Sequence, residues 1–255
     1  MSRVEARRAI FVAPFEELSE PALVAELAAR AEGKGWDGFF VWDHVAYKEP
    51  VEALADPWVT LAAIAMRTER VRIGPLVTPI PRRRPHQLAR ETVTLDRLSR
   101  GRLILGVGLG SEVTGEFDPA RFGEEGDPRA RAKLLDDGLD RLLSYWDGGF
   151  EPRPVQRPRI PIWVAARWPK RKPLRRAARY DGLFPIDLPD PDALAQMADE
   201  LSALREDDAP FDLVAEGEAG ADPAPWAEAG ATWFLTGFGR QPTRAEVEAA
   251  IDAGP

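Results

Sequence analysis

Short apolar runs alternate with segments of helical periodicity along the whole chain. Eight of the runs have the length and the β-branched and aromatic content of buried strands, and they cover residues 9–14, 38–43, 71–78, 103–108, 160–165, 182–186, 211–215 and 232–235. The intervening segments place apolar residues three and four positions apart and predict helices over residues 21–32, 57–67, 85–99, 129–146, 173–180, 191–205, 223–229 and 243–253. Ser19 and Asp56 are the expected N-caps of the first two helices.

This alternation predicts parallel strands joined by right-handed helical crossovers, and eight such strands close a barrel. A length of 255 residues is ordinary for one barrel. We therefore predict an α/β fold, a (β/α)8 TIM barrel, in which residues 1–255 form a single domain. The alternative is an open, doubly wound sheet, which is weakened because no Gly-x-Gly-x-x-Gly sequence follows the first strand.

The composition limits the classes of function. Hydrophobic residues make up 44% of the chain, which suffices for a buried core, and the net charge of −8 argues against a general nucleic-acid-binding protein. The chain has no cysteine and two histidines, so disulfides and thiolate chemistry are excluded and no metal site is expected. The first eight residues lead into no apolar signal segment, and no apolar run approaches the roughly 20 residues of a membrane helix. We expect a soluble, cytoplasmic protein.

Two strand ends carry residues that suggest chemistry, because reactive groups in a barrel lie at the carboxyl ends of its strands. The second strand ends in Asp43-His44, where a histidine would act as proton donor, proton acceptor or hydrogen-bond anchor. The third ends in Thr78-Pro79, which forces extended backbone and breaks the strand. The plainer alternatives are a capped surface turn for Asp43-His44 and a simple strand terminator for Thr78.

The fourth and fifth strands are followed by candidate binding loops. Gly106 and Gly108 let a ligand or a neighbouring backbone approach, and Glu112 beyond them is either an acid–base group or a solvated loop residue. Arg167 and the Lys-Arg-Lys run at residues 170–172 precede a helix, a combination that suits a phosphate but is otherwise a solvated surface. The irregular stretches 111–128 and 148–159 have the length of lids or binding loops.

Taken together, these pieces resemble the bacterial luciferase-like superfamily of flavin- and deazaflavin-dependent oxidoreductases. The matching segments are residues 35–44, 56–68, 71–110, 160–167, 175–185 and 229–235, in order and over nearly the full chain. Each motif alone is modest, and the series is specific. The resemblance implies a TIM barrel that binds FMN or the deazaflavin, coenzyme F420, at the mouth formed by the carboxyl ends of its strands.

The resemblance also assigns positions to the cofactor. The ring would lie against Val77 and Thr78, where relatives often carry a bulge or a non-prolyl cis peptide, and Asp43-His44 would contact the ring or the substrate. The phosphate would lie by residues of the fifth strand end and the basic run, namely Ala165, Ala166, Arg167, Lys170 and Arg171. Relatives often have paired glycines where this chain has Ala165-Ala166. True luciferases have Cys-Arg where this chain has Gly108-Leu109, so light emission is not expected.

The expected function is hydride transfer or monooxygenation of a small organic substrate, with His44 and Glu112 as the catalytic candidates. The basic clusters slightly favour F420, which has the longer anionic tail, and leave FMN open. The alternative is a noncatalytic flavin-binding protein of the same fold, toward which Ala165-Ala166 is a faint hint. A barrel hydrolase or aldolase would need a metal cluster or a Schiff-base lysine at a strand end, and the sequence offers neither. Dimers are common among relatives, and nothing in the sequence forbids a homodimer.

Overall fold

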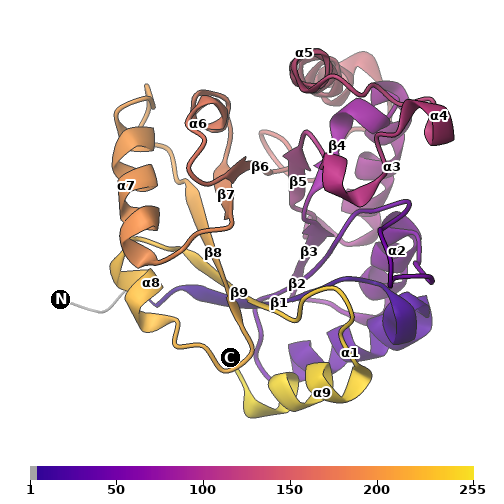
Figure 1. Cartoon of the computed structure of the whole chain (residues 1–255), viewed down its shortest axis with the longest axis vertical. Coiled ribbons are helices and arrows are strands. Elements are labelled where there is room, and N and C mark those ends of the chain that lie inside the picture. The colour runs from indigo at the N-terminus through magenta and orange to yellow at the C-terminus, as the bar shows by residue number, and fades with distance from the viewer. Residues whose placement is uncertain (1–4) are drawn as a thin grey trace.

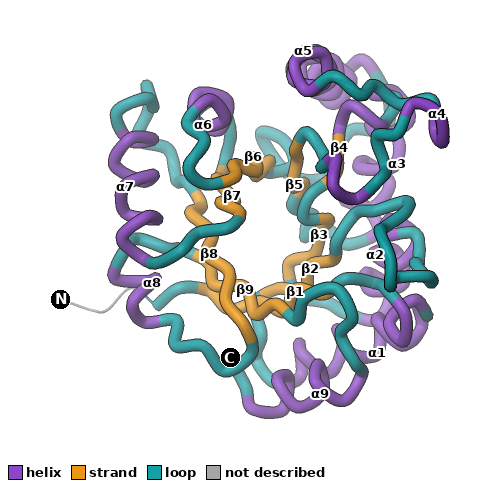
Figure 2. Tube along the Cα trace, viewed as in Figure 1, coloured by secondary structure: helices purple, strands orange, loops and turns teal. Residues whose placement is uncertain are grey.

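The computed structural model describes residues 5–255; residues 1–4, the start of the stretch considered above for a signal segment, lie outside the described residues. Within the described part, one sheet of parallel strands has the order β3-β2-β1-β9-β8-β7-β6-β5-β4. Figure 2 shows the strands as a ring with the helices outside it. The strands are β1 (Arg7–Val12), β2 (Gly38–Val41), β3 (Arg72–Pro75), β4 (Thr78–Pro79), β5 (Leu105–Gly108), β6 (Ile162–Arg167), β7 (Gly182–Ile186), β8 (Asp212–Glu218) and β9 (Trp233–Gly237).

The ring closes at the third predicted strand. Residues 71–78 form two short strands, β3 and β4, separated by a cis peptide bond between Leu76 and Val77. β3 pairs with β2 and also meets the entry to β5, where the Ile73 N–H donates to the Arg102 carbonyl at 3.1 Å. β4 pairs with the end of β5. The two ends of the sheet therefore meet in a nearly closed barrel, which confirms the predicted TIM fold and excludes the open sheet.

Helices cover the outside of the barrel (Figure 1). They are α1 (Pro21–Gly33), α2 (Pro57–Arg67), α3 (Pro85–Leu98), α4 (Pro119–Phe122), α5 (Pro128–Ser144), α6 (Lys172–Ala177), α7 (Pro191–Ser202), α8 (Ala224–Glu228) and α9 (Arg244–Ala253). Asp56 caps α2 as predicted, since its side chain accepts from the N–H groups of Trp58 and Val59. Ser19 does not cap α1: its hydroxyl donates to the Glu16 carbonyl, and Glu20 is the N-cap residue. Within residues 5–255, every helix is too short or too polar to cross a bilayer.

Apolar side chains fill two layers. The inner layer plugs the barrel with large residues, among which Phe40, Trp163 and Trp233 contact one another at ring-centroid distances of 5.4–5.8 Å. The outer layer lies between the strands and the helices. Alternate residues of a strand point into opposite layers. Inward-pointing residues that lie nearer the carboxyl end of a strand than these large side chains therefore line the mouth of the barrel.

A buried arginine joins the ends of α2 and α3 to the start of β3 at the base of the barrel. Arg102, in the Ser-Arg-Gly-Arg sequence at residues 99–102, donates to the carbonyls of Ala65, Thr68, Val71 and Ser99 at 2.8–3.0 Å. Residues 148–159, considered above as a lid, enter β6 from this same end. Their Val155 and Gln156 N–H groups donate to Asp96 of α3. That loop therefore supports the base of the barrel, away from the mouth.

Candidate active site

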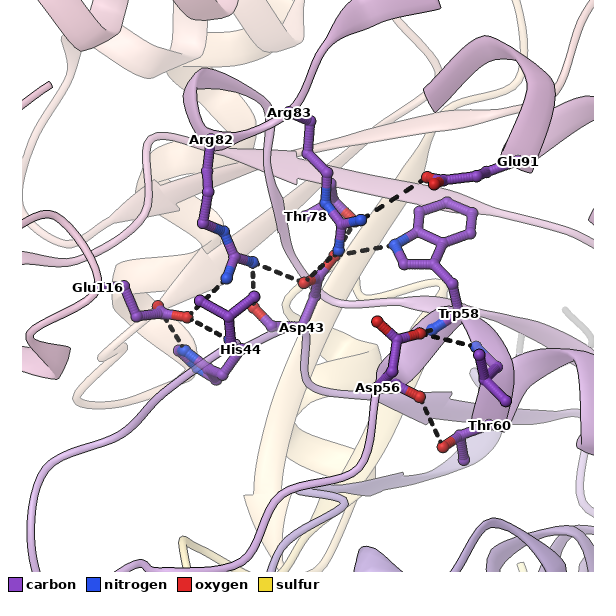
Figure 3. A network of polar contacts seen from close by, with 12 residues as sticks. Asp43, His44, Asp56, Trp58, Thr60, Thr78, Arg82, Arg83, Glu91 and Glu116 are labelled. Atoms are coloured by element: carbon purple, nitrogen blue, oxygen red, sulfur yellow. Dashed lines mark hydrogen bonds and ion pairs between the residues drawn. The ribbon is translucent and has the colours of Figure 1, made fainter. Parts of the chain in front are cut away.

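Asp43, two residues beyond the end of β2, joins four segments at the mouth of the barrel (Figure 3). Its Oδ2 accepts from the Thr78 hydroxyl at 2.7 Å and from the Trp58 indole N–H at 3.1 Å. Arg82 donates to Oδ1 at 2.7 Å, and Arg83 donates to both oxygens at 2.9 Å. Because Asp43 is 1% exposed and both carboxylate oxygens are occupied, its side chain holds the site together from within the protein. From the sequence, Asp43 is expected to contact the cofactor or the substrate. Because both oxygens already accept hydrogen bonds from the protein, this geometry does not favour a direct contact between the Asp43 carboxylate and a cofactor.

The carboxylate that faces His44 comes from the loop after β5. Glu116 Oε2 lies 2.7 Å from His44 Nδ1, and Oε1 accepts from Arg82 at 2.8 Å and from the Val45 N–H at 2.7 Å. The Glu116 side chain is fully buried, whereas the imidazole is 17% exposed. A carboxylate at Nδ1 makes that nitrogen the donor. Nε2, which has no hydrogen-bond partner among the described residues, is then the atom available to accept or deliver a proton.

Sequence reasoning assigned the acidic role to Glu112, which the structure places elsewhere. Glu112 is 59% exposed at its side chain and pairs with Arg131 of α5 at 3.0 Å. Arg131 also lies over the Phe117 ring, 4.5 Å from its centroid, and a side chain on Gly110 would collide with that ring. These contacts fold the loop back so that Glu116, four residues after Glu112, reaches His44.

The imidazole of His44 lies in an aromatic cage. The rings of Phe15, Trp42 and Tyr47 lie 5.0–5.9 Å from it, centroid to centroid. Burial is the main cause that raises the pKa of the Tyr47 phenol. These three rings limit the access of water to the imidazole and hold its plane. A ligand bound at the mouth is therefore the main group with which His44 can exchange a proton.

The buried charges of the site balance. Burial alone would raise the pKa of Glu116, but the hydrogen bond and charge of His44, the charge of Arg82 and the Val45 N–H together hold this pKa below its ordinary value. The carboxylates of Asp43 and Glu116 are matched by the guanidinium groups of Arg82 and Arg83. Glu116 therefore stays ionised and orients His44 throughout the neutral range.

Replacing Glu116 by glutamine should make stability less sensitive to acid. A carboxyl whose pKa is lower in the folded state stabilises the fold above its unfolded pKa, and this contribution is lost as the pH falls through the folded value. The free energy of unfolding of the wild type should therefore fall more steeply below pH 4.5 than that of Glu116→Gln, and at pH 7 the variant should be about 1–3 kcal/mol less stable. Urea unfolding at a series of pH values measures both. Glu112→Gln is the control, and equal acid sensitivity in wild type and Glu116→Gln would contradict the prediction.

A wall of small residues lies beside the His44 site. Val77 follows the cis peptide and packs against the inner layer, while Thr78 is fully buried and faces Asp43. A side-chain carbon built on Gly108 would lie 3.0 Å from Val77 and 3.5 Å from Ala165. One surface of small side chains is thus formed by Val77, just before β4, by Gly108 of β5 and by Ala165 of β6. No large side chain among these three projects from it, so it has room for a flat ring. Gly106 is used differently: a side chain there would strike Leu76 and the Pro75 carbonyl, so this glycine allows close packing below the kink.

Two of the four cations at residues 167–172 are paired within the protein. Arg167 forms an ion pair with Asp187, and Arg171 pairs with Glu200 of α7 at 2.7 Å and lies over Trp168. Lys170 is exposed, and no ion pair involves its side chain in residues 5–255. The side chain of Ala166 belongs to the outer layer and faces the helices. The structure therefore brings Ala165 and Arg167 to the mouth, whereas among residues 5–255 the unpaired cations of this segment that a phosphate could meet are Lys170 and Lys172.

One mouth residue was missed altogether. Glu216 lies in β8, in register with Leu235 of the inner layer, and two residues beyond Val214 of that layer. Burial, with a smaller contribution from the charge of Asp187, raises the pKa of the Glu216 carboxyl to about 7. The sequence pattern ended this strand at residue 215 because the next residue is charged. A signal was nevertheless present, since Glu216 continues the alternation that places Val214 inside.

The mouth of the barrel thus holds a histidine oriented by a buried carboxylate and, on β5 and β6, a low surface of small residues. Residues 10–250 match the family described as luciferase-like monooxygenase, and the chain belongs to this family. Members of this family are oxidoreductases or monooxygenases.

Named relatives include reductases and oxygenases. The chain is 31% identical over 223 residues to a phthiodiolone/phenolphthiodiolone dimycocerosates ketoreductase of Mycobacterium sp. (strain JLS), covering 80% of this chain and 53% of that protein. It is 28% identical over 158 residues to the oxygenase component of a flavin-dependent trigonelline monooxygenase of Acinetobacter baylyi, covering 56% of this chain and 42% of that one. The chain thus spans about half the length of these relatives.

Solved structures share the fold over the full chain. An F420-dependent secondary alcohol dehydrogenase in complex with an F420-acetone adduct superposes with a TM-score of 0.78 at 18% identity, covering 97% of this chain and 96% of that one. The coenzyme F420-dependent tetrahydromethanopterin reductase of Methanopyrus kandleri gives 0.73 at 17% identity, with the same coverage. At these identities the likeness shows the fold alone.

Proposed function

We infer that this protein is an F420-dependent oxidoreductase that interconverts an alcohol and a carbonyl group on a small organic substrate. The observation that carries the inference is the 2.7 Å contact between His44 and the buried Glu116, which leaves the other imidazole nitrogen available at the mouth. Interconversion of an alcohol and a carbonyl requires one proton to be moved to or from the substrate oxygen, and an oriented histidine does this near neutral pH.

The residues present fit a flat cofactor. The low surface of Val77, Gly108 and Ala165 can take one face of a ring, because no side chain rises from it higher than a valine. A bound deazaflavin supplies the two-electron donor or acceptor in this reaction. Lys170 and the Arg167 region would hold the acidic end of the cofactor, and the chain's own contribution is to orient the substrate, exclude water and move the proton at His44 Nε2.

Two findings support F420 and carbonyl chemistry over FMN and oxygenation. The mycobacterial relative at 31% identity is named a ketoreductase. The two F420-dependent enzymes superpose with TM-scores of 0.78 and 0.73, whereas the monooxygenase RslO1 of Streptomyces bottropensis and the FMN complex of a Baeyer–Villiger monooxygenase give 0.67 and 0.66. FMN-dependent monooxygenation is the second candidate, favoured by the Acinetobacter relative.

Titration of the purified protein with F420 and, separately, with FMN tests the proposal. We expect F420 to bind and to raise the free energy of unfolding by about 2.7 kcal/mol at about 100 times its dissociation constant. The bound F420 should lose its oxidised absorption band when cyclohexanol is added. Binding of FMN alone would replace the proposal by the oxygenase candidate, and binding of neither cofactor would refute both.

A further inference from the structure

Glu216 lies across the barrel from the wall proposed to hold the ring. In the strand order, β8 is four positions from β3 and four from β4, the two halves of the kinked strand. Figure 2 shows β8 on the side of the ring opposite β3 and β4. Glu216 points into the barrel, because its partner in the register is Leu235 of the inner layer. A substrate resting on a ring held by Val77 would therefore have Glu216 on its other side.

The Glu216 carboxyl has no hydrogen-bond or ion-pair partner within residues 5–255. A side-chain carbon on Gly237 would lie 2.6 Å from Glu216 Oε1, so the glycine is what makes room for this carboxyl. Glu216 is partly exposed and its side chain continues the inner register, so the hydrogen-bonding positions of its carboxyl are open to a ligand in the mouth.

Charged neighbours narrow the choice of ligand. Asp187, at the end of β7, lies close enough for its charge to raise the pKa of Glu216, and Asp187 is itself paired with Arg167 of β6. Glu218 follows on the same strand, and Gly237 on β9 brings no charge. Next to Glu216 itself, the carboxylates of Asp187 and Glu218 are offset by the guanidinium of Arg167 alone, so an anionic group placed at Glu216 is disfavoured, and more strongly when Glu216 ionises.

We propose that Glu216 binds a hydroxyl group of an uncharged substrate, remote from the carbon–oxygen bond that reacts at His44. A hydroxyl both donates and accepts, so it satisfies a protonated carboxyl as well as a carboxylate, whereas a carbonyl satisfies the protonated form alone. The substrate class is thus a small diol or hydroxyketone. This assignment rests on the proposed function for the reacting end, and Glu216 acts in specificity.

Binding of matched probes to the F420-loaded protein tests the assignment. Ligand-observed NMR gives dissociation constants for cyclohexane-1,4-diol, cyclohexanol and 4-hydroxycyclohexanecarboxylate. Wild type should bind the diol about tenfold more tightly than cyclohexanol, as one hydrogen bond to this group predicts. Glu216→Leu should lose that preference and Glu216→Gln should keep most of it. Glu218→Gln, altered two residues along the same strand, should keep all of it.

The anionic probe provides a signature that a merely structural role would not give. Between pH 6 and 8 the protonated fraction of a group with a pKa of about 7 falls from about nine tenths to about one tenth. Affinity of the wild type for 4-hydroxycyclohexanecarboxylate should fall over this range by about tenfold, and Glu216→Gln, which keeps Asp187, Arg167 and Glu218, should show no such fall.

Failure of this proposal is distinguishable from failure of the proposed function. No preference for the diol in wild type, or a preference that survives in Glu216→Leu, overturns the assignment of Glu216 while F420 binding and cyclohexanol oxidation still stand. If F420 does not bind, the same probes are measured on the cofactor-free protein. A diol preference that depends on Glu216 there would retain the assignment and refute only the cofactor.

Discussion

Replacing His44 by alanine is expected to lower kcat for alcohol oxidation by about 10²–10⁴-fold, the usual contribution of a positioned acid–base group. The imidazole is the titrating group that reaches the mouth next to the proposed ring wall, and Glu116 fixes its orientation through Nδ1. The affinity for F420 should change little, because the surface proposed to hold the ring is formed by Val77, Gly108 and Ala165 and not by His44. Stopped-flow reduction of bound F420 and fluorescence titration of F420 measure the two quantities separately.

The other histidine provides the control for this prediction. His86 is exposed in the first turn of α3, and His86→Ala should leave both kcat and cofactor affinity unchanged. His44→Gln separates proton transfer from packing, since glutamine fills the site and can donate to Glu116 but does not titrate. That variant should be as slow as His44→Ala and should lose the pH dependence of kcat near neutrality. A kcat within threefold of wild type in both variants would show that His44 is not the acid–base group.

The hydrophobic pattern was sufficient to predict the barrel and the order of its elements, because both depend on burial that recurs at regular intervals. It was weakest at the carboxyl ends of the strands. β6, β8 and β9 continue to Arg167, Glu218 and Gly237, two or three residues beyond the predicted ends. At the mouth, inward positions no longer need apolar side chains, so the hydrogen-bonded ladder extends past the end of the apolar pattern. Glu216 was missed for this reason.

The partner of His44 was missed for a different reason. Glu116 lies in an irregular loop, where neither periodicity nor capping indicates the direction of a side chain. Its place depends on three tertiary contacts: the Gly110 backbone against Phe117, Arg131 over Phe117, and Arg131 with Glu112. Sequence reasoning proposed a glutamate of this loop, Glu112, and the structure places a different glutamate of the same loop, Glu116, beside His44. The particular glutamate could be chosen only when the loop was seen folded against α5.

The buried network around Asp43 should contribute more to stability than any other polar contact discussed here. Asp43→Ala removes one of the two carboxylates that pair with Arg82 and the carboxylate that contacts Arg83 at 2.9 Å. It also removes the hydrogen-bond acceptor of the Thr78 hydroxyl and of the Trp58 indole. Removing one partner of a buried ion pair typically costs 3–5 kcal/mol, since the charge left behind remains desolvated. We expect a loss of about 3–5 kcal/mol in the free energy of unfolding, measured by urea denaturation at pH 7.

Asp56→Ala is the matched comparison, because the Asp56 side chain lies in the same part of the barrel but accepts only from two backbone N–H groups of α2, with no guanidinium partner among the described residues. Asp56→Ala should cost about 1 kcal/mol, the usual effect of losing an N-cap. Asp43→Asn keeps the shape and part of the hydrogen bonding but removes the charge, so its loss should fall between those of the two alanine variants and should be measurable even if Asp43→Ala does not fold. Should Asp43→Asn and Asp43→Ala both cost no more than Asp56→Ala, the guanidinium groups of Arg82 and Arg83 must find other partners. The orientation of Glu116 and His44 would then depend on the loop alone.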